Sequence, residues 1–147
     1  MATVMELLNK KDRVVWTVPV TATIREALTL MRQQRIGAVP VMDLDKVAGI
    51  FSERDYARHV ADAKELALDK PVRDLMAHPV FIVRADQDID ECMNVMTAKK
   101  IRHLPVMKDD ELIGIISIGD VVKQLLDEKS LVIDNLHYYI AGRSNPR

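Results

Sequence analysis

The sequence carries the stretch Gly49-Ile50-Phe51-Ser52-Glu53-Arg54-Asp55 and, 65 residues later, the stretch Gly114-Ile115-Ile116-Ser117-Ile118-Gly119-Asp120. Both follow one pattern: a glycine, two apolar residues, a serine, two further residues and an aspartate. The same shift aligns residues 14–56 with residues 79–121 without a gap, and 14 of these 43 positions are identical. Self-similarity at one fixed spacing is typical of a duplicated structural unit. The 147-residue chain is therefore predicted to contain two copies of one unit.

Each copy predicts the element order strand, helix, strand, strand, helix. The expected strands are short apolar runs at residues 14–18, 38–42, 47–51, 80–83, 104–107 and 112–116. Thr23, with Glu26 three residues later, forms a capping box ahead of an amphipathic helix over residues 24–31. Pro40 and Pro105 stand inside expected strands, so these strands should lie at a sheet edge or carry a bulge, because proline cannot donate to a ladder.

Helices expected outside the aligned region do not share its spacing. Residues 3–8 resemble residues 71–76 at a spacing of 68, so three additional residues lie in the turn at residues 9–13. Residues 131–141 place apolar side chains at helical intervals and are followed by Gly142, which predicts a separate last helix.

The duplication sets the domain organisation that we expect. Residues 1–66 form the first copy with an N-terminal helix, residues 67–128 the second copy with a linker helix, and residues 129–147 a C-terminal helix and tail. A copy of about 60 residues buries too little surface to be stable by itself. We therefore predict an α+β fold in which two βαββα copies pack sheet to sheet with pseudo-two-fold symmetry. This packing leaves two related clefts, and small ligands bind at such junctions.

The composition argues against several classes of partner. Lys and Arg number 21 against 22 Asp and Glu, and the resulting net charge of −1 argues against a nucleic-acid partner, which needs a basic excess. The apolar runs are far shorter than the roughly 20 residues of a membrane-spanning helix, which argues against a membrane partner. The single cysteine, Cys92, cannot form a disulfide within the chain, so a cytoplasmic location is expected.

The repeated motif suggests a chemistry of its own. Its serine can cap a new helix, and the free N–H groups of that helix end favour an anion such as a phosphate. Asp55 and Asp120, one turn further along, could accept hydrogen bonds from a vicinal diol such as ribose, and Arg54 would add a positive charge. The same Ser-x-x-Asp spacing also forms an ordinary capping box that binds nothing, so both interpretations stay open.

The order of these motifs resembles a known family. Ile36-Gly37-Ala38-Val39-Pro40-Val41 followed by the motif at 49–55, with the pattern repeated in the second copy, is similar to a tandem pair of cystathionine-β-synthase-type (CBS) domains, the Bateman module. The resemblance covers residues 1 to about 128 and extends to stand-alone two-domain members that have no catalytic domain. It implies the CBS fold and an adenosyl ligand in the clefts. That ligand is AMP, ADP or ATP, with NAD(H) or S-adenosylmethionine derivatives in some members.

The resemblance also implies roles for individual residues. Asp55 and Asp120 would bind ribose hydroxyls, with Ser52 and Ser117 beside them. The residues that line the adenine pockets would be Gly37, Ala38, Val39 and Pro40 in one copy and Arg102, His103, Leu104 and Pro105 in the other. The apolar walls would be Thr17, Val18, Ile82 and Val83. The phosphate ligands would be Arg54, Arg102 and His103. Gly119 replaces Arg54, and Gly37-Ala38 replace Arg102-His103, at the aligned positions. The two sites are therefore not expected to be equivalent, and the one with Ser52, Arg54 and Asp55, completed by Arg102 or His103, should bind phosphate better.

The predicted function is a non-catalytic adenine-nucleotide sensor that requires no cofactor. It would form a homodimer and report energy or redox state to a regulated partner protein. The sequence shows no catalytic set and no metal-ligating set at suitable spacings. Two alternatives stay open: an interaction homodimer whose clefts are empty, and a cryptic enzyme that acts on nucleotides.

Overall fold

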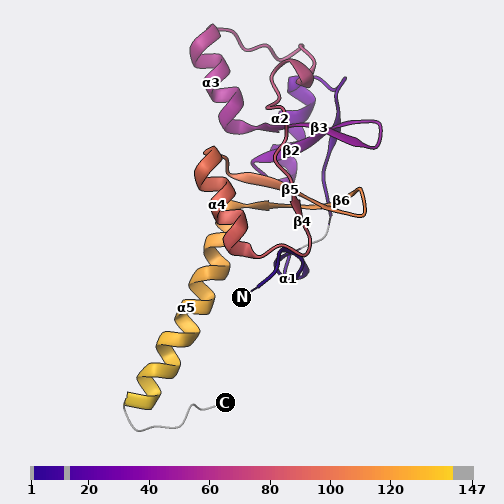
Figure 1. The fold of residues 1–147 in the computed structure, drawn as a ribbon. Coiled ribbons are helices and arrows are strands. Elements are labelled where there is room, and N and C mark those ends of the chain that lie inside the picture. The colour runs from indigo at the N-terminus through magenta and orange to yellow at the C-terminus, as the bar shows by residue number, and fades with distance from the viewer. Residues whose placement is uncertain (1, 12–13, 141–147) are drawn as a thin grey trace.

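Two similar lobes, each with a three-stranded sheet, make up the structure (Figure 1). The computed structural model describes residues 2–11 and 14–140, with side chains as far as Lys129. The elements in chain order are α1 (Val4–Asn9), β1 (Val18–Pro19), α2 (Ile24–Gln34), β2 (Ala38–Asp43), β3 (Lys46–Ser52), α3 (Glu53–Ala63), the 3₁₀ helix η1 (Val72–Asp74), β4 (Val83–Arg84), α4 (Ile89–Lys99), β5 (His103–Lys108), β6 (Glu111–Ser117) and α5 (Ile118–Ile140).

Both sheets have the same topology. β1 pairs in parallel with β2, β2 pairs antiparallel with β3, and β4, β5 and β6 repeat this order. Val18 lies opposite Val41 in the first sheet, and the residues 65 positions further on, Val83 and Val106, lie opposite each other in the second. The predicted α+β fold of two repeated units is confirmed.

β2 and β5 are the central strands of their sheets, although each contains a proline. Pro40 lies opposite Ile50 of β3, whose N–H and C=O both bond to Ala77 instead, at 3.1 and 2.8 Å. The Pro40–Ile50 pair is therefore not hydrogen-bonded, and the missing proline N–H leaves no gap in that ladder. A register shift follows between Val41 and Met42, and the second sheet repeats it. The additional residues of this shift, Ala48 and Ile113, belong to β3 and β6, so the irregularity lies beside the proline strands, and neither proline strand lies at an edge.

Three elements differ clearly from their predicted extent. β1 and β4 are two residues long, rather than the runs 14–18 and 80–83, because only these residues pair with the central strand. α5 runs unbroken from Ile118 to Ile140, so the separate helix expected from residue 131 is wrong. No proline, and no glycine beyond Gly119, interrupts the sequence between 118 and 140, so nothing in the backbone forces a break. The tail at 141–147 lies outside the described residues.

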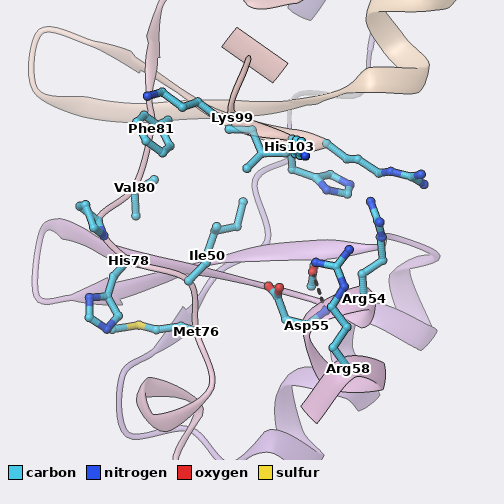
Figure 2. A pocket seen from close by; sticks show the side chains of 16 residues that line it. Ile50, Arg54, Asp55, Arg58, Met76, His78, Val80, Phe81, Lys99 and His103 are labelled. Atoms are coloured by element: carbon cyan, nitrogen blue, oxygen red, sulfur yellow. Dashed lines mark hydrogen bonds between the residues drawn. The ribbon is translucent and has the colours of Figure 1, made fainter. Parts of the chain in front are cut away.

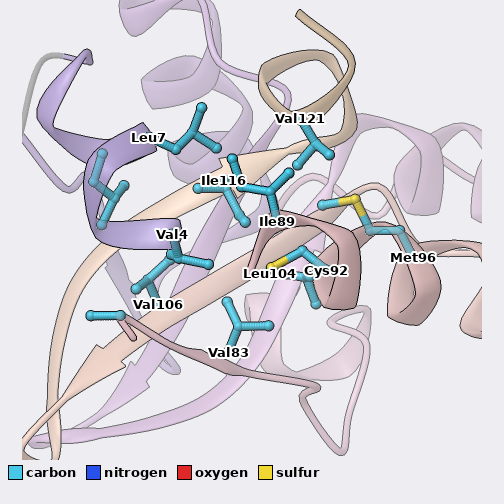
Figure 3. Packing of buried hydrophobic residues seen from close by; sticks show 12 residues of the cluster. Val4, Leu7, Val83, Ile89, Cys92, Met96, Leu104, Val106, Ile116 and Val121 are labelled. Carbon is cyan, nitrogen blue, oxygen red and sulfur yellow. The ribbon is translucent and has the colours of Figure 1, made fainter. Parts of the chain in front are cut away.

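The segment that precedes each copy packs into the core of the other copy. In the second lobe, Val4 and Leu7 of α1 lie among buried residues of β4, β5 and β6 (Figure 3). In the first lobe, Val72 of η1 is fully buried among residues of α2, β2 and β3. The leading segments are therefore exchanged between the lobes.

Backbone hydrogen bonds fix this exchange at equivalent places. The N–H of Val4 donates to the carbonyl of Gln87 at 2.9 Å, and the N–H of Val72 donates to the carbonyl of Ala22 at 2.6 Å. The donors are 68 residues apart and the acceptors are 65 apart, in agreement with the two spacings in the sequence. The boundary after residue 66 divides the sequence copies, whereas in space α1 joins the second lobe and η1 joins the first.

Gly49 lies where the second leading segment touches the first sheet, and alanine there is expected to destabilise the fold. A Cβ at Gly49 would stand 2.7 Å from Cγ of Met76 and 3.0 Å from the carbonyl oxygen of Ala77. Overpacking of this kind costs about 1–3 kcal/mol. Urea unfolding of Gly49→Ala should show a loss of that order in the free energy of unfolding.

Gly119→Ala is the matched control for this substitution. A Cβ at Gly119 meets no atom closer than Oγ of Ser117, at 3.6 Å, and the position lies in the first turn of α5. Its free energy of unfolding should stay unchanged or rise slightly, because alanine favours a helix over glycine. Equal losses in both variants would contradict the packing argument.

Candidate functional site

An open cavity of about 570 Å³ lies where the two lobes meet. Three segments line it: the end of β3 with the start of α3, the linker residues 76–81, and residues 99–103 between α4 and β5. The linker passes along the outer edge of β3, where Ala77 bonds to Ile50, before it enters the second lobe. Both sequence copies therefore contribute walls to one cavity.

The apolar side chains of the linker and the two arginines of α3 occupy opposite sides of the cavity. Figure 2 shows Val80 and Phe81 on one side. Arg54 and Arg58 lie on the other side, and Asp55 lies between the two groups. This order suits a ligand with a flat apolar group at one end, hydroxyl groups in the middle and negative charge at the other end.

Asp55 stands in the first turn of α3 with a free carboxylate. Ser52 is the N-cap of this helix, and its Oγ accepts a hydrogen bond from the N–H of Asp55 at 3.1 Å. Among the described residues, no group donates a hydrogen bond to the Asp55 carboxylate. A free carboxylate can accept hydrogen bonds from two adjacent hydroxyls, and the positive helix end stabilises its charge.

Five cationic side chains line the cavity against this one carboxylate. They are Arg54, Arg58, Lys99, Lys100 and Arg102. In the part of the chain that the structure describes, none of them pairs with an acid, and Nζ of Lys99 lies 5.1 Å from the ring centroid of Phe81. Unpaired cations around one space favour an anionic ligand, and guanidinium donors match the oxygens of a phosphate.

His103 lines the cavity and is within electrostatic reach of both repeated aspartates. Burial lowers the pKa of His103 below its ordinary range. The carboxylates of Asp120 and Asp55 act to raise it, whereas the charges of Lys11 and Arg102 lower it further. The imidazole is therefore neutral at neutral pH and can donate one hydrogen bond and accept another.

Asp120, the counterpart of Asp55 in the second copy, is already engaged. Its Oδ2 accepts hydrogen bonds from Nζ of Lys11 at 2.6 Å and from the N–H of Ser117 at 2.9 Å. Burial acts to raise the pKa of Asp120, but these two hydrogen bonds and the charge of Lys11 outweigh it, so the pKa lies below its usual value. The second copy therefore keeps the Ser117 helix cap, but the carboxylate of Asp120 is already paired.

The cavity brings together some of the residues predicted from the sequence. Ser52, Arg54, Asp55, Arg102 and His103 all line it. Seven other predicted residues are buried, namely Val18, Ala38, Val39, Pro40, Val83, Leu104 and Pro105. Thr17, Gly37 and Ile82 are not buried and do not line it, and Ser117 and Asp120 belong to the second copy's helix start. The apolar wall is thus made largely by residues outside the predicted set.

Sequence reasoning missed the linker wall and one cation. Val80 and Phe81 face the cavity, whereas the predicted Val83 is buried in the second core. Arg58 follows Arg54 by four residues on α3, so the two lie on one helix face. That spacing is a signal that could have found Arg58, whereas nothing local in the sequence places residues 76–81 against the first copy.

The described part of the chain offers little to other chemistries. Burial raises the pKa of the Cys92 thiol to about 11, so it is protonated and weakly nucleophilic. Among the residues that the structure describes, no cluster of three or more His, Cys, Asp or Glu side chains is arranged to hold a metal ion. No described helix is long and apolar enough to span a membrane.

Fold and cavity together define a tandem module with an open cavity between two repeated lobes. The chain belongs to the CBS domain family: the model of the CBS domain matches residues 4–62 and again residues 72–127. The resemblance noted in the sequence is confirmed. The two matches coincide with the two sequence copies.

Relatives and solved structures agree with this membership. A mitochondrial CBS domain-containing protein of Arabidopsis thaliana is 34% identical over 125 residues, or 82% of this chain, and the chain spans 61% of that protein's length. A solved CBS-domain containing protein from Agrobacterium tumefaciens is 40% identical, with a TM-score of 0.79 over 84% of this chain and 98% of its own. A CBS domain protein from Pyrobaculum aerophilum, complexed with AMP, is 32% identical, with a TM-score of 0.71 over 81% of this chain and 89% of its own.

The pKa of His103 is expected to report the charges on either side of it. Asp120→Asn should lower this pKa further, because a carboxylate that favours the imidazolium is removed. Lys11→Ala should raise it, because an ammonium that disfavours the imidazolium is removed. NMR titration of the His103 ring in the wild type and both variants measures the two shifts. Shifts of the same sign in the two variants would contradict this arrangement.

Proposed function

We propose that this protein is a non-catalytic adenine-nucleotide sensor. AMP, ADP, ATP or NAD(H) binds in the cavity between the lobes, and a partner protein detects the occupied state. The observation that carries the proposal is that one cavity combines an apolar wall, the Asp55 carboxylate and five cations, none of which has an ion-pair partner among the described residues. The AMP complex of the Pyrobaculum relative supports the same class of ligand.

In this proposal, each part of the nucleotide meets its own residues. The base packs against the apolar side at Val80 and Phe81, and Asp55 accepts hydrogen bonds from the two ribose hydroxyls. The phosphates then point toward Arg54 and Arg58, where the guanidinium groups and the N-terminal end of α3 both favour negative charge.

The charge of the cavity favours phosphate-bearing ligands among those that the family binds. Five cations face one carboxylate, so an anionic ligand gains attraction from most of the lining charges. S-adenosylmethionine carries a positive sulfonium, which the same charges repel. We therefore place AMP, ADP, ATP and NAD(H) ahead of S-adenosylmethionine derivatives.

Ligand binding would be sensed because both sequence copies hold the ligand. Arg54 and Asp55 come from the first copy, whereas Arg102 and His103 come from the second. A nucleotide that contacts both ties the lobes into one arrangement, and a partner responds only if the ligand favours that arrangement over another.

The assembly and setting that we propose follow the resemblance. The functional unit is a cytoplasmic homodimer that regulates a partner protein, needs no cofactor and has neither nucleic acid nor a membrane as its partner. The exposed apolar residues Val122 and Leu126 on α5 support a contact with a second copy, since each exposes at least 40% of its surface.

Asp55→Asn is expected to weaken nucleotide binding. The substitution keeps the shape of the side chain but removes the charge that strengthens hydrogen bonds from ribose, and such bonds contribute about 1.5–3 kcal/mol. Affinity for ATP, measured by isothermal titration calorimetry, should fall by about 10–100-fold.

Asp62→Asn provides the matched control, because Asp62 is exposed near the other end of the same helix. Its affinity for ATP should equal that of the wild type. An unchanged affinity in Asp55→Asn would overturn the ribose assignment. No heat from AMP, ATP or NADH at millimolar concentration with the wild type would instead favour the interaction homodimer with empty clefts, and turnover of the nucleotide would favour an enzyme.

A series of ligands that differ in charge tests the role of the cations. Affinity should increase from AMP to ADP to ATP, and S-adenosylmethionine should bind at least about tenfold more weakly than ATP, because each added phosphate charge meets unpaired cations. The preference for ATP should shrink as the salt concentration rises, because salt screens partly exposed charges. Equal affinity for S-adenosylmethionine and ATP would contradict the charge argument.

A further inference from the structure

The repeat relates the open cavity to an equivalent place in the second copy, at Ile115 and Asp120, which we call the second cleft, and Lys11 extends to it. Nζ of Lys11 donates hydrogen bonds to Oδ2 of Asp120 at 2.6 Å and to the carbonyl oxygen of Ile115 at 3.0 Å. Asp120 and Ile115 are the counterparts of Asp55 and Ile50, which line the open cavity. The ammonium group therefore contacts two positions that belong to a ligand cavity in the other copy.

The same two positions are arranged differently in the open cavity. The carbonyl of Ile50 accepts a hydrogen bond from the backbone N–H of Ala77 at 2.8 Å, so a linker residue fills that place without extending a side chain. The Asp55 carboxylate is free of donors among the described residues. In the second cleft, one lysine replaces the backbone donor and also neutralises the carboxylate.

The length of the chain before the cleft explains how Lys11 reaches it. Leu8 lies against Gly114, and Met76 lies against Gly49. Leu8 and Met76 are therefore counterparts, each packed against the motif glycine of the other sequence copy. After Leu8 the sequence has three more residues than after Met76 before the two copies align again. With these three additional residues in the sequence, the side chain of Lys11 lies at the start of α5.

The second cleft has also lost cations that the open cavity uses. Gly119 stands at the position of Arg54, Gly37 at that of Arg102, and Gln34 at that of Lys99. Phosphate binding there would depend on fewer charges, while its carboxylate is already paired with the chain's own ammonium group.

We propose that this chain binds one nucleotide, because Lys11 closes the second cleft by occupying the place of the ribose contacts at Asp120. This inference rests on the proposed function of the open cavity. Lys11 acts as a built-in cationic substitute for the ligand: it satisfies the carboxylate and the strand carbonyl, and a nucleotide must displace it to enter.

The number of bound nucleotides tests this proposal. Isothermal titration calorimetry of the full chain with ATP should give one site in the wild type and a second, weaker site in Lys11→Ala. Adding Asp120→Asn to Lys11→Ala should remove the second site again, because the freed carboxylate is lost. Lys10→Ala is the matched control: Lys10 bonds to Gln124 at 2.7 Å rather than to Asp120, and one site is expected.

The outcomes separate this inference from the proposed function. Two sites in the wild type would overturn the inference and leave the nucleotide sensor intact. One site in both the wild type and Lys11→Ala, with a native circular dichroism spectrum for the variant, would show that Lys11 is not what closes the cleft. No binding in the wild type would contradict the proposed function, and the inference with it.

Discussion

The exchange of the two leading segments is the interaction on which this structure depends. Each lobe by itself is a three-stranded sheet with a few short helices, too small to bury a sufficient core. α1 fills the core of the second lobe and η1 fills that of the first, and both form backbone hydrogen bonds to the lobe they join. Each lobe therefore contains chain from both sequence copies, and the orientation of the lobes is set by backbone bonds rather than by side-chain contacts only.

The same exchange builds the cavity. Because η1 is anchored in the first lobe, the chain must return to the second lobe along the outer edge of β3. On that path Ala77 pairs with Ile50, and Val80 and Phe81 become the apolar wall opposite Arg54. Consecutive linker residues thus pair with the first sheet and line the cavity, so the proposed ligand would touch the segment that joins the lobes.

The sequence predicted the repeated topology and the cap at Ser52, because these follow from local patterns. The sequence could not distinguish residues that line the cavity from residues that are buried in the core. Val39 and Leu104 were expected at pockets but are fully buried, since both faces of the central strands are covered and an apolar residue there gives no alternation to read. The exchange was equally hidden, because two spacings of 68 and 65 show that the segments correspond but not which lobe each one joins.

Comparison of the copies separates what the fold requires from what a ligand requires. Gly49 and Gly114 are the same in both copies because a leading segment packs against each, and a side chain there would displace it. Arg54 and Gly119 differ because their position, at the start of a helix in the cleft, bears on charge and not on packing. The two halves could therefore keep one topology while their clefts diverged in charge. Three additional residues after Leu8 accompany the contact of Lys11 with one aspartate, while the other has no donor among the described residues.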